Sequence, residues 1–215
     1  HAHVERLFLE GRRAVGVVYR SNGKRIQAQA RREVVVSAGA INSPMILQHS
    51  GIGPAEELKQ LGIDIVADSR AVGRNMQDHT LVGMALSLKV PTVNDLLRSP
   101  IGQVMRGIQY ILTKSGPLAF SVNQAGAFIK TRPDLKTPDS QLYFMPMTYH
   151  ASYNNESLGL QLDKFSGLSL GASPTRPKSR GWLRISSSDP MAGPEIHPNY
   201  LSDEDDLRVV VESLK

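Results

Sequence analysis

A run of small residues that follows a β-branched segment is the part of this sequence most able to hold a ligand. Glu33–Ser37 has the composition of a buried strand, Ala38-Gly39 follows it, and Gly51 ends a short helical stretch. Because Ala38-Gly39 carries no side chain beyond a methyl group, the backbone there can approach a nucleotide closely. Helix amides after Ser43-Pro44 can then face a polar group of that ligand.

The same layout also has a purely structural explanation. Many α/β proteins join a valine-rich strand to a helix through a glycine turn for packing alone, and a short motif is only a hypothesis. The residues by themselves therefore leave nucleotide binding and packing equally open.

Composition and charge exclude several other functions. The 215 residues include no cysteine and carry a formal charge of +5. Without cysteine the chain forms no disulfide and no thiolate or Cys-ligated zinc site. Its basic residues are scattered, with short pairs only at Arg12-Arg13 and Arg31-Arg32, so we expect no nucleic-acid partner. No apolar stretch is long enough to span a bilayer, so we expect a cytoplasmic protein without an integral membrane segment, in solution or at a membrane surface.

The histidines do not form a recognisable metal site. His1 and His3 are spaced to share one face of a strand, but the sequence offers no third ligand beside them. His49 is expected at a helix end, where the negative end of the helix dipole favours it, and His150 and His197 are expected in loops. We therefore expect no bound metal.

The first part of the chain is expected to form short strands and helices. Strands are expected over residues 4–9, 13–20, 24–30, 32–37 and 63–66. Asn22-Gly23 between two alternating segments predicts the tight turn of a hairpin. A helix is expected from Pro54 to Leu61, with Gly62 as its stop.

From Leu81 onward the pattern is typical of an antiparallel sheet with helices. Strands are expected over residues 81–88, 124–130, 141–145, 168–172 and 182–186. One helix is expected over residues 101–113, and a final helix is expected to begin after an N-cap within Ser202–Asp205. Asn154–Lys164 is polar and without a clear period, so it is expected to be a loop.

Two segments resemble the signatures of the glucose-methanol-choline (GMC) flavoprotein oxidoreductases. The first matches at Gly39, Ala40, Ser43, Pro44, Ile46, Leu47, Ser50, Gly51, Ile52 and Gly53. The second, Val72–His79, is similar to the family's Val-Gly-x-Asn-Leu-x-Asp-His element, with Met76 in place of the usual Leu. Weaker landmarks follow in the family's order at residues 13–17, 32–34, 126–128, 179–181 and 198–200. Within the family, the chain resembles the choline dehydrogenase-like alcohol dehydrogenases.

The resemblance implies an α+β chain with two domains. Residues 1–79 would be a strip of an α/β FAD-binding domain, and residues 80–215 an antiparallel-sheet substrate domain with helices. It also implies a fragment, because the family's N-terminal dinucleotide fingerprint and its C-terminal segment with the catalytic histidine have no match here. We therefore expect the chain to be inactive alone.

The implied cofactor is FAD, and the implied reaction is oxidation of an alcohol CH–OH group by hydride transfer to the flavin. Val4, Ala38 and Gly39 are the expected contacts for the adenosine part of FAD, although Val4 is equally well explained as an ordinary strand residue. The expected partners are a small-molecule alcohol and the remainder of the chain's own FAD domain. A non-catalytic binding or scaffold module on the same fold stays open as the alternative.

A second set of expected cofactor residues lies in the Val72–His79 element. The resemblance implies that Asn75, Asp78 and His79 border the isoalloxazine. The other explanation is that these side chains order a loop by bonding its backbone.

Gln124 bears on the substrate. In choline-specific relatives a Glu stands in the segment that resembles residues 123–128, where its carboxylate can pair with a quaternary ammonium. A neutral Gln cannot supply that charge, and a buried cation without a counterion is costly. Met145 and Met147, with Phe120 and Phe128, are candidates for an apolar substrate pocket, although such residues in strands are more often core. A neutral alcohol is therefore expected rather than choline.

Overall fold

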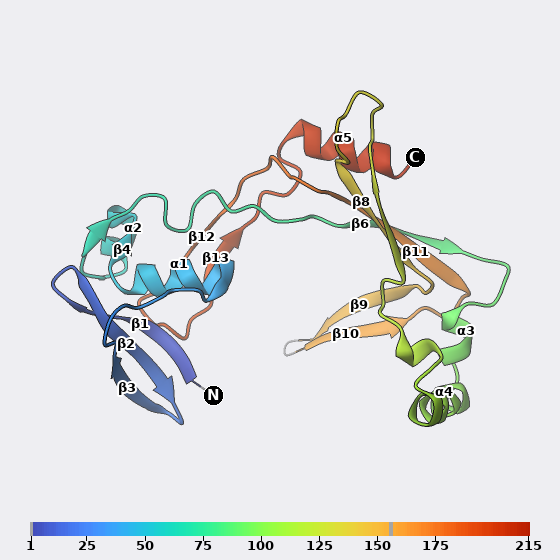
Figure 1. Ribbon diagram of the computed structural model, residues 1–215, viewed down its shortest axis with the longest axis horizontal. Coiled ribbons are helices and arrows are strands. Elements are labelled where there is room, and N and C mark those ends of the chain that lie inside the picture. The colour runs from blue at the N-terminus through green and yellow to red at the C-terminus, as the bar shows by residue number, and fades with distance from the viewer. Residues whose placement is uncertain (1, 155–156) are drawn as a thin grey trace. The chain divides into compact units, whose positions relative to one another are not determined.

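The computed structural model describes residues 2–154 and 157–215 and is drawn in Figure 1. The residues form two compact units. The first comprises the chain up to Asp78 together with Ser179–Ser202, and the second comprises His79–Lys178 and Asp203–Lys215.

A three-stranded antiparallel sheet opens the first unit. Its strands are β1 (Ala2–Glu10), β2 (Arg13–Ser21) and β3 (Lys24–Gln29), in the order β1-β2-β3. Asn22 and Gly23 both have positive φ angles, of 49° and 75°, as the tight hairpin turn requires. The three predicted strands and their turn are confirmed.

Short elements complete the first unit. They are α1 (Gly39–His49), β4 (Ile52–Gly53), α2 (Ala55–Gln60), β5 (Ala67–Asp68), β12 (Trp182–Arg184) and β13 (Glu195–His197). Their core joins Met45 of α1 and Leu58 of α2 to Leu183 and Ile185 of the returning segment. The predicted helix over residues 54–61 is confirmed, with Pro54 as its N-cap.

The chain returns to the first unit at residues 179–202. The sequence, in contrast, predicts a single domain boundary after residue 79. Met76 and Gly181 exchange two backbone hydrogen bonds, with N–O distances of 2.9 and 2.8 Å. Gln48 is almost fully buried, and its Oε1 accepts a hydrogen bond from the Ile185 amide at 2.8 Å. These long-range bonds also place the predicted strand near residues 182–186 in the first unit instead of the antiparallel sheet.

A four-stranded antiparallel sheet organises the second unit. Its strands are β6 (Val82–Ser87), β7 (Ala125–Ile129), β8 (Ser140–Met145) and β11 (Gly167–Pro174), in the order β6-β11-β8-β7. All four were predicted from the sequence to within two residues at either end. A hairpin of β9 (Tyr149–Asn154) and β10 (Ser157–Leu162) extends between β8 and β11.

The two faces of this sheet differ in character. Directly paired residues of antiparallel strands share a face. One row of partners is Gly83, Gly171, Tyr143 and Gly126, and the adjacent row is Met84, Leu170, Phe144 and Ala125. The first face is therefore lined mainly by small residues and the second by apolar ones.

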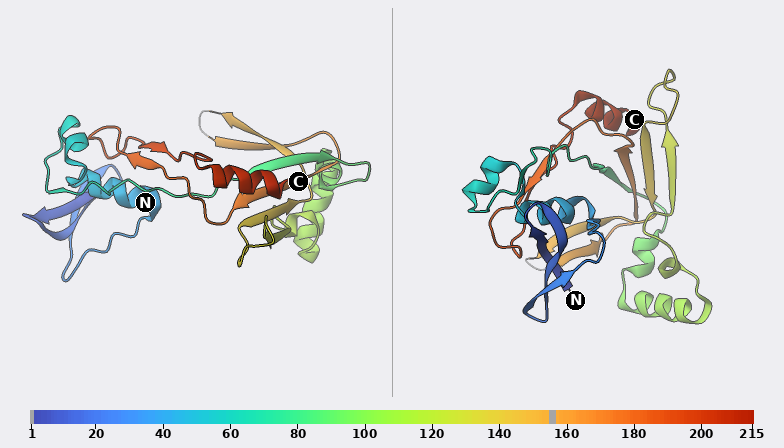
Figure 2. Two further views of the ribbon diagram at one scale, coloured as in Figure 1. Left: turned by 90° about the horizontal axis from the view of Figure 1, so that it is seen from above. Right: turned by 60° about the vertical axis from the view of Figure 1, so that its left-hand side comes forward.

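Helix α5 (Glu204–Ser213) packs against the apolar face. Asp203 caps it by accepting a hydrogen bond from the Asp205 amide, as the acidic first turn predicts. Val209 and Val210 are buried, and the hydroxyl of Ser213 lies 2.7 Å from that of Ser140 on β8. Both views of Figure 2 show α5 (dark red) beside the sheet.

A helical excursion connects β6 to β7. It consists of α3 (Val93–Leu97), α4 (Pro100–Thr113) and a 3-10 turn (Pro117–Ala119). The helix predicted over residues 101–113 is confirmed as α4, and Lys114 ends it in the left-handed conformation with φ 51°.

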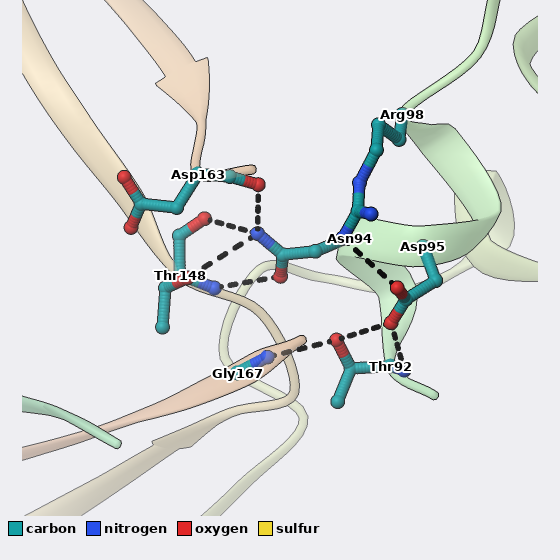
Figure 3. A network of polar contacts seen from close by, with 7 residues as sticks. All are labelled: Thr92, Asn94, Asp95, Arg98, Thr148, Asp163 and Gly167. Carbon is teal, nitrogen blue, oxygen red and sulfur yellow. Dashed lines mark hydrogen bonds and ion pairs between the residues drawn. The ribbon is translucent and has the colours of Figure 1, made fainter. Parts of the chain in front are cut away.

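Asn94 joins this excursion to the residues that flank the β9–β10 hairpin (Figure 3). Its fully buried amide nitrogen donates to the carbonyls of Thr148 (2.8 Å) and Asp163 (3.1 Å), and its oxygen accepts from the Thr148 amide (2.9 Å). Thr92 accepts from the Gly167 amide at 3.1 Å and shares a capping box with Asp95. We call the contacts of Thr92 and Asn94 the clasp.

Several sequence predictions of secondary structure are wrong. His150 and His197, expected in loops, lie in the strands β9 and β13. Residues 32–37 form no strand, since no described strand pairs with them, and Val35 is 74% exposed. The strand predicted over residues 63–66 instead forms at Ala67–Asp68, where the register with β4 permits pairing. The loop predicted over residues 154–164 contains β10, whose Leu158, Leu160 and Leu162 alternate with period two.

Replacement of Asn94 tests the clasp. Asn94→Asp keeps the size of the side chain but removes its donor group and adds a buried charge facing the Thr148 and Asp163 carbonyls. We expect the second unit to lose about 2–4 kcal/mol of stability in denaturant unfolding followed by circular dichroism. The matched exposed change Asn123→Asp should leave the midpoint in place, and equal midpoints for both variants would contradict the assigned role of Asn94.

Candidate functional site

A cavity of about 230 Å³ lies between the start of β1 and α1 in the first unit. Val4 and Ala38, two predicted contacts for the cofactor, both line it. Met45, Ile46 and His49 of α1 form further parts of its wall. The fold therefore brings Val4 and Ala38 together although they lie far apart in the sequence.

Gly39, beside this cavity, has open space around it. Its φ of +87° is a conformation that other residues rarely adopt, and a Cβ built on it would meet nothing within 4 Å. Close approach of a ligand to the backbone is thus possible here.

The start of α1 differs from the sequence prediction. The helix begins at Gly39 and contains Pro44, whereas the sequence places its start after Ser43-Pro44. The Ser43 hydroxyl accepts the hydrogen bond from the Ala38 amide at 2.9 Å, so this amide is already used within the protein. Any polar contact from the Ala38-Gly39 turn must come from other groups.

His49 is a buried neutral group on the cavity wall. Only 9% of the residue is exposed, and its Nε2 has no hydrogen-bond partner among the described residues. Burial lowers its pKa below the ordinary 6.5, because the imidazolium would lose its solvation, and the Asp189 carboxylate opposes this effect only in part. The cavity wall therefore carries no charge from His49 at neutral pH.

The predicted isoalloxazine residues are exposed and lie in an ordered loop. Asn75 has a φ of +58°, and Asp78 accepts a hydrogen bond from the Tyr200 hydroxyl. This bond, together with burial and the charge of Asp78, raises the pKa of Tyr200. His79 belongs to the second unit, where its Nε2 lies 3.1 Å from the Thr175 carbonyl oxygen. The loop-ordering explanation thus has direct support at Asp78, and contact with the flavin stays a prediction.

The three predicted substrate residues lie at one end of the four-stranded sheet. Gln124 is exposed, and its backbone N–H donates to the Phe144 carbonyl at 3.0 Å. Met145 is buried, with the Tyr149 hydroxyl 4.0 Å from its sulfur, as a core residue would be. Met147 is partly exposed, and its carbonyl accepts a hydrogen bond from Ser169. Their contact with a substrate stays a prediction.

Sequence reasoning missed one charged cluster near the cavity. Glu5 follows Val4, is buried, and accepts hydrogen bonds from Arg20 (2.8 Å) and Arg25 (2.6 Å). Burial alone would raise the pKa of Glu5, but the two arginines outweigh it and hold the pKa below its usual value. The sequence signal for this cluster was a carboxylate at an inward-facing position of β1, together with arginines on the neighbouring strands β2 and β3.

The described residues contain neither a cluster of metal ligands nor a membrane-spanning helix. No group of three or more His, Cys, Asp or Glu residues within 2–154 and 157–215 is placed to hold a metal ion. In the same part of the chain, no helix has the length and apolar character needed to cross a bilayer.

Comparison with known proteins identifies the family. Residues 1–81 match the family model described as GMC oxidoreductase. Over 206 residues, the chain is 36% identical to the mitochondrial choline dehydrogenase of Homo sapiens, an alignment that covers 95% of this chain and 33% of that protein. The chain belongs to the GMC oxidoreductase family.

Other GMC relatives extend the comparison. The alcohol dehydrogenase (acceptor) of Pseudomonas putida is 34% identical over 217 residues, which cover 100% of this chain and 38% of that protein. A structure of formate oxidase from Aspergillus oryzae, solved to study FAD modification, superposes with a TM-score of 0.84 at 25% identity, covering 99% of this chain and 41% of the other. The chain spans about a third of the length of the curated GMC relatives it matches.

The expectation of FAD as cofactor is confirmed for the GMC family, whose N-terminal domain is the FAD-binding domain. The residues present fit such a group. The open space beside Gly39 is a place that any side chain would fill, and the small Ala38 lies on the wall of the cavity that Val4 also lines. Contact of Val4, Ala38 and Gly39 with FAD stays a prediction.

The buried state of His49 predicts a pH dependence of stability. Its pKa is lower in the folded than in the unfolded chain, so the unfolded chain binds the extra proton first as the pH falls. Stability should be full above the ordinary pKa of 6.5 and decrease as the pH falls below it. The single tryptophan, Trp182, lies in the first unit, so its fluorescence can report the denaturation midpoint between about pH 5 and 7.

A variant isolates this contribution. His49→Leu should flatten the pH dependence of the midpoint in that window, because the titrating group is gone. Met45→Leu changes the wall of the same cavity without changing a titrating group and should keep the wild-type slope. An unchanged slope in His49→Leu would show that another group is responsible.

Proposed function

We propose that this chain is part of an FAD-dependent oxidoreductase that oxidises the CH–OH group of a neutral alcohol by hydride transfer to the flavin. The observation that carries the proposal is the cavity shared by Val4 and Ala38, next to the open Gly39, in a chain of the GMC family. A scaffold module would have no need for this space.

Each unit has its own task in the proposed reaction. In the first unit, Val4, Ala38 and Gly39 leave room for the adenosine part of FAD and exclude side chains from it. FAD, when bound, accepts the hydride from the alcohol carbon. In the second unit, the four-stranded sheet forms one wall of the substrate site, with Gln124 and Met147 at its edge. The base that takes the hydroxyl proton is not assigned to any residue of this chain.

The charge of the sheet supports a neutral substrate. None of the strands β6, β7, β8 and β11 contains an acidic or basic residue. Gln124, directly before β7, is uncharged as well. A quaternary ammonium placed against this wall would lose water without gaining a counterion, which is unfavourable.

The relatives leave both substrate classes open. The human relative is named for choline and the Pseudomonas putida relative for an alcohol, at nearly equal identity. The uncharged sheet favours the second class for this chain.

A pair of glycine variants tests the cofactor site in the full-length protein. Gly39→Val places a branched side chain in the proposed FAD space and strains the backbone at φ +87°. We expect flavin occupancy to fall about tenfold or more, measured by absorbance after purification. Gly11→Val is the control, because Gly11 also has positive φ (+59°) and open space but lies in the β1–β2 turn.

The two variants together separate strain from cofactor loss. Both should lose similar stability, and only Gly39→Val should lose flavin. If Gly39→Val purifies with a full complement of flavin, the turn serves packing alone.

A second test concerns the substrate. In the full-length enzyme, Gln124→Glu should raise kcat/KM for choline relative to a neutral primary alcohol. A partly desolvated ion pair is worth about 1–3 kcal/mol, or roughly a fivefold to hundredfold change in that ratio. The gain can appear in KM alone, since an equal contact in ground and transition states leaves kcat unchanged.

Gln141→Glu is the matched control for this test. It adds the same charge to β8 opposite Phe128, at the other end of the β7–β8 ladder, and should change the ratio little. A wild-type enzyme that already prefers choline would overturn the argument from the uncharged sheet.

A further inference from the structure

His49 carries a polar atom that the fold leaves without a partner. Among residues 2–154 and 157–215, the buried side-chain atoms without a hydrogen-bond partner are His49 Nε2 and Arg208 Nε. Arg208 Nε lies 3.5 Å from the Asp205 carboxylate, so an opposite charge compensates it. Burial keeps His49 neutral at neutral pH, and a neutral ring cannot be compensated by an ion pair. His49 is therefore the side chain whose environment needs an explanation.

A buried imidazole without a hydrogen-bond partner is unfavourable. The ring loses its bonds to water on folding, and this loss is offset only when another group bonds it. Leucine, an aliphatic residue of comparable size, would avoid the loss altogether. In folded proteins such a group normally finds a partner, which can be a ligand, an ion or a water molecule. The position of His49 relative to the cavity decides among these partners.

The cavity beside His49 suits a flat aromatic ligand with a polar edge. Val4, Ala38, Met45 and Ile46 line it together with His49. Their aliphatic side chains can cover the apolar faces of a ring system, while the imidazole can bond its edge. Ligand pockets typically combine an apolar lining with a few polar groups that fix the orientation of the ligand. His49 has this second role on the cavity wall.

The buried carboxylate on the same cavity is already used within the sheet. Glu5 lines the cavity, but its two oxygens accept hydrogen bonds from Arg20 Nε at 2.8 Å and Arg25 Nε at 2.6 Å. Arg20 and Arg25 are direct cross-strand partners, so Glu5 also offsets the repulsion between two like charges. These bonds commit Glu5 to the sheet and leave His49 as the buried polar side chain that can bond a ligand.

Hydrogen bonds fix the position of His49 before any ligand binds. His49 is the last residue of α1, and the next residue, Ser50, joins this helix to β1. The buried Ser50 hydroxyl accepts a hydrogen bond from the Leu7 amide at 2.8 Å and donates one to the Ile46 carbonyl. A ligand would meet an imidazole that is already in place, so the ordering cost of binding is small.

We propose that His49 bonds the edge of the adenine ring of FAD and thereby favours FAD over FMN. The inference rests on the proposed FAD site, to which Val4, Ala38 and Gly39 belong. A neutral imidazole has one N–H donor and one acceptor nitrogen. The edge of adenine likewise presents an amino donor beside a ring-nitrogen acceptor, so the two groups are complementary.

The cavity fits adenine better than the other parts of FAD. Its volume of about 230 Å³ is below the roughly 300–1,000 Å³ of sites that enclose a whole drug-sized ligand, so it suits one small ring system. The isoalloxazine, with three fused rings, is larger than the two-ring adenine. Phosphates are disfavoured because His49 is neutral and lies at the C-terminal end of α1, where the helix dipole is negative.

Titration of the flavin-free full-length protein with FAD and with FMN tests the proposal, because FMN lacks the adenosine part. His49→Leu should weaken FAD binding about fivefold or more, since one hydrogen bond to the ligand is lost. FMN binding should stay at the wild-type level. Calorimetry at about pH 8 gives both affinities under conditions in which His49 of the wild type is neutral.

Further variants separate hydrogen bonding from shape. His49→Gln keeps a donor and an acceptor on the side chain and should retain more FAD affinity than His49→Leu. His150→Leu makes the same replacement at an exposed histidine of the second unit and should bind both flavins like the wild type. Circular dichroism confirms the folding of each variant. If His49→Leu does not fold, His49→Met supplies a more adaptable apolar side chain for the same comparison.

Three results would overturn the proposal. Unchanged FAD affinity in His49→Leu would assign the imidazole to a water molecule or to another part of the polypeptide. An equal loss of FAD and FMN binding would assign His49 a structural role, and an equal loss of FAD affinity in His49→Gln and His49→Leu would assign it to packing.

Alcohol oxidation by the wild-type holoenzyme tests the proposed function separately. A protein that needs His49 for FAD but oxidises no alcohol would contradict the proposed function alone. An active enzyme whose FAD affinity is unchanged in His49→Leu would contradict only the role of His49.

Discussion

The first unit depends on a steric constraint at Gly73. A Cβ on this residue would lie 2.2 Å from the Leu183 carbonyl oxygen, and its φ of +79° disfavours any other residue. Only a glycine therefore allows the Leu183 amide to bond the Gly73 carbonyl at 2.7 Å. That contact holds the returning segment on α1 and α2, where Leu183 and Ile185 complete the core. The same packing fixes α1, and with it the cavity that Val4 and Ala38 share.

The second unit follows a different design. Its central sheet contains no charged residue, α5 packs on the apolar face at β8 and β11, and its helical excursion is fixed by the buried side-chain amide of Asn94. Charge is concentrated outside the sheet, for example in the ion pair of Lys178 with Asp205 on α5.

Several local signals were read correctly from the sequence, although the alternating pattern of β10 was missed. The Asn22-Gly23 turn, the strands beside it and the capped helices α4 and α5 depend on neighbouring residues, so their sequence suffices. Contacts between distant segments could not be predicted. Asn94 bonds Thr148, 54 residues away, and Gln48 bonds Ile185, 137 residues away. No sequence pattern predicts either contact.

The candidate site likewise combines features that are predictable from neighbouring residues with features that depend on contacts between distant segments. The small residues Ala38 and Gly39 were found from local composition. Val4 was named by the family resemblance alone, and the fold brings it to the cavity that Ala38 also lines. The strand predicted over residues 32–37 failed because a strand needs a paired neighbour, which the hydrophobic pattern alone does not supply.

The absorption spectrum of the purified full-length protein tests the central claim most directly. We predict a flavin band at about 450 nm that bleaches when a neutral primary alcohol is added without oxygen. Bleaching by the alcohol would show that the bound flavin accepts a hydride from a CH–OH group. A folded full-length protein with no flavin band, or with a band that no alcohol bleaches, would contradict the account.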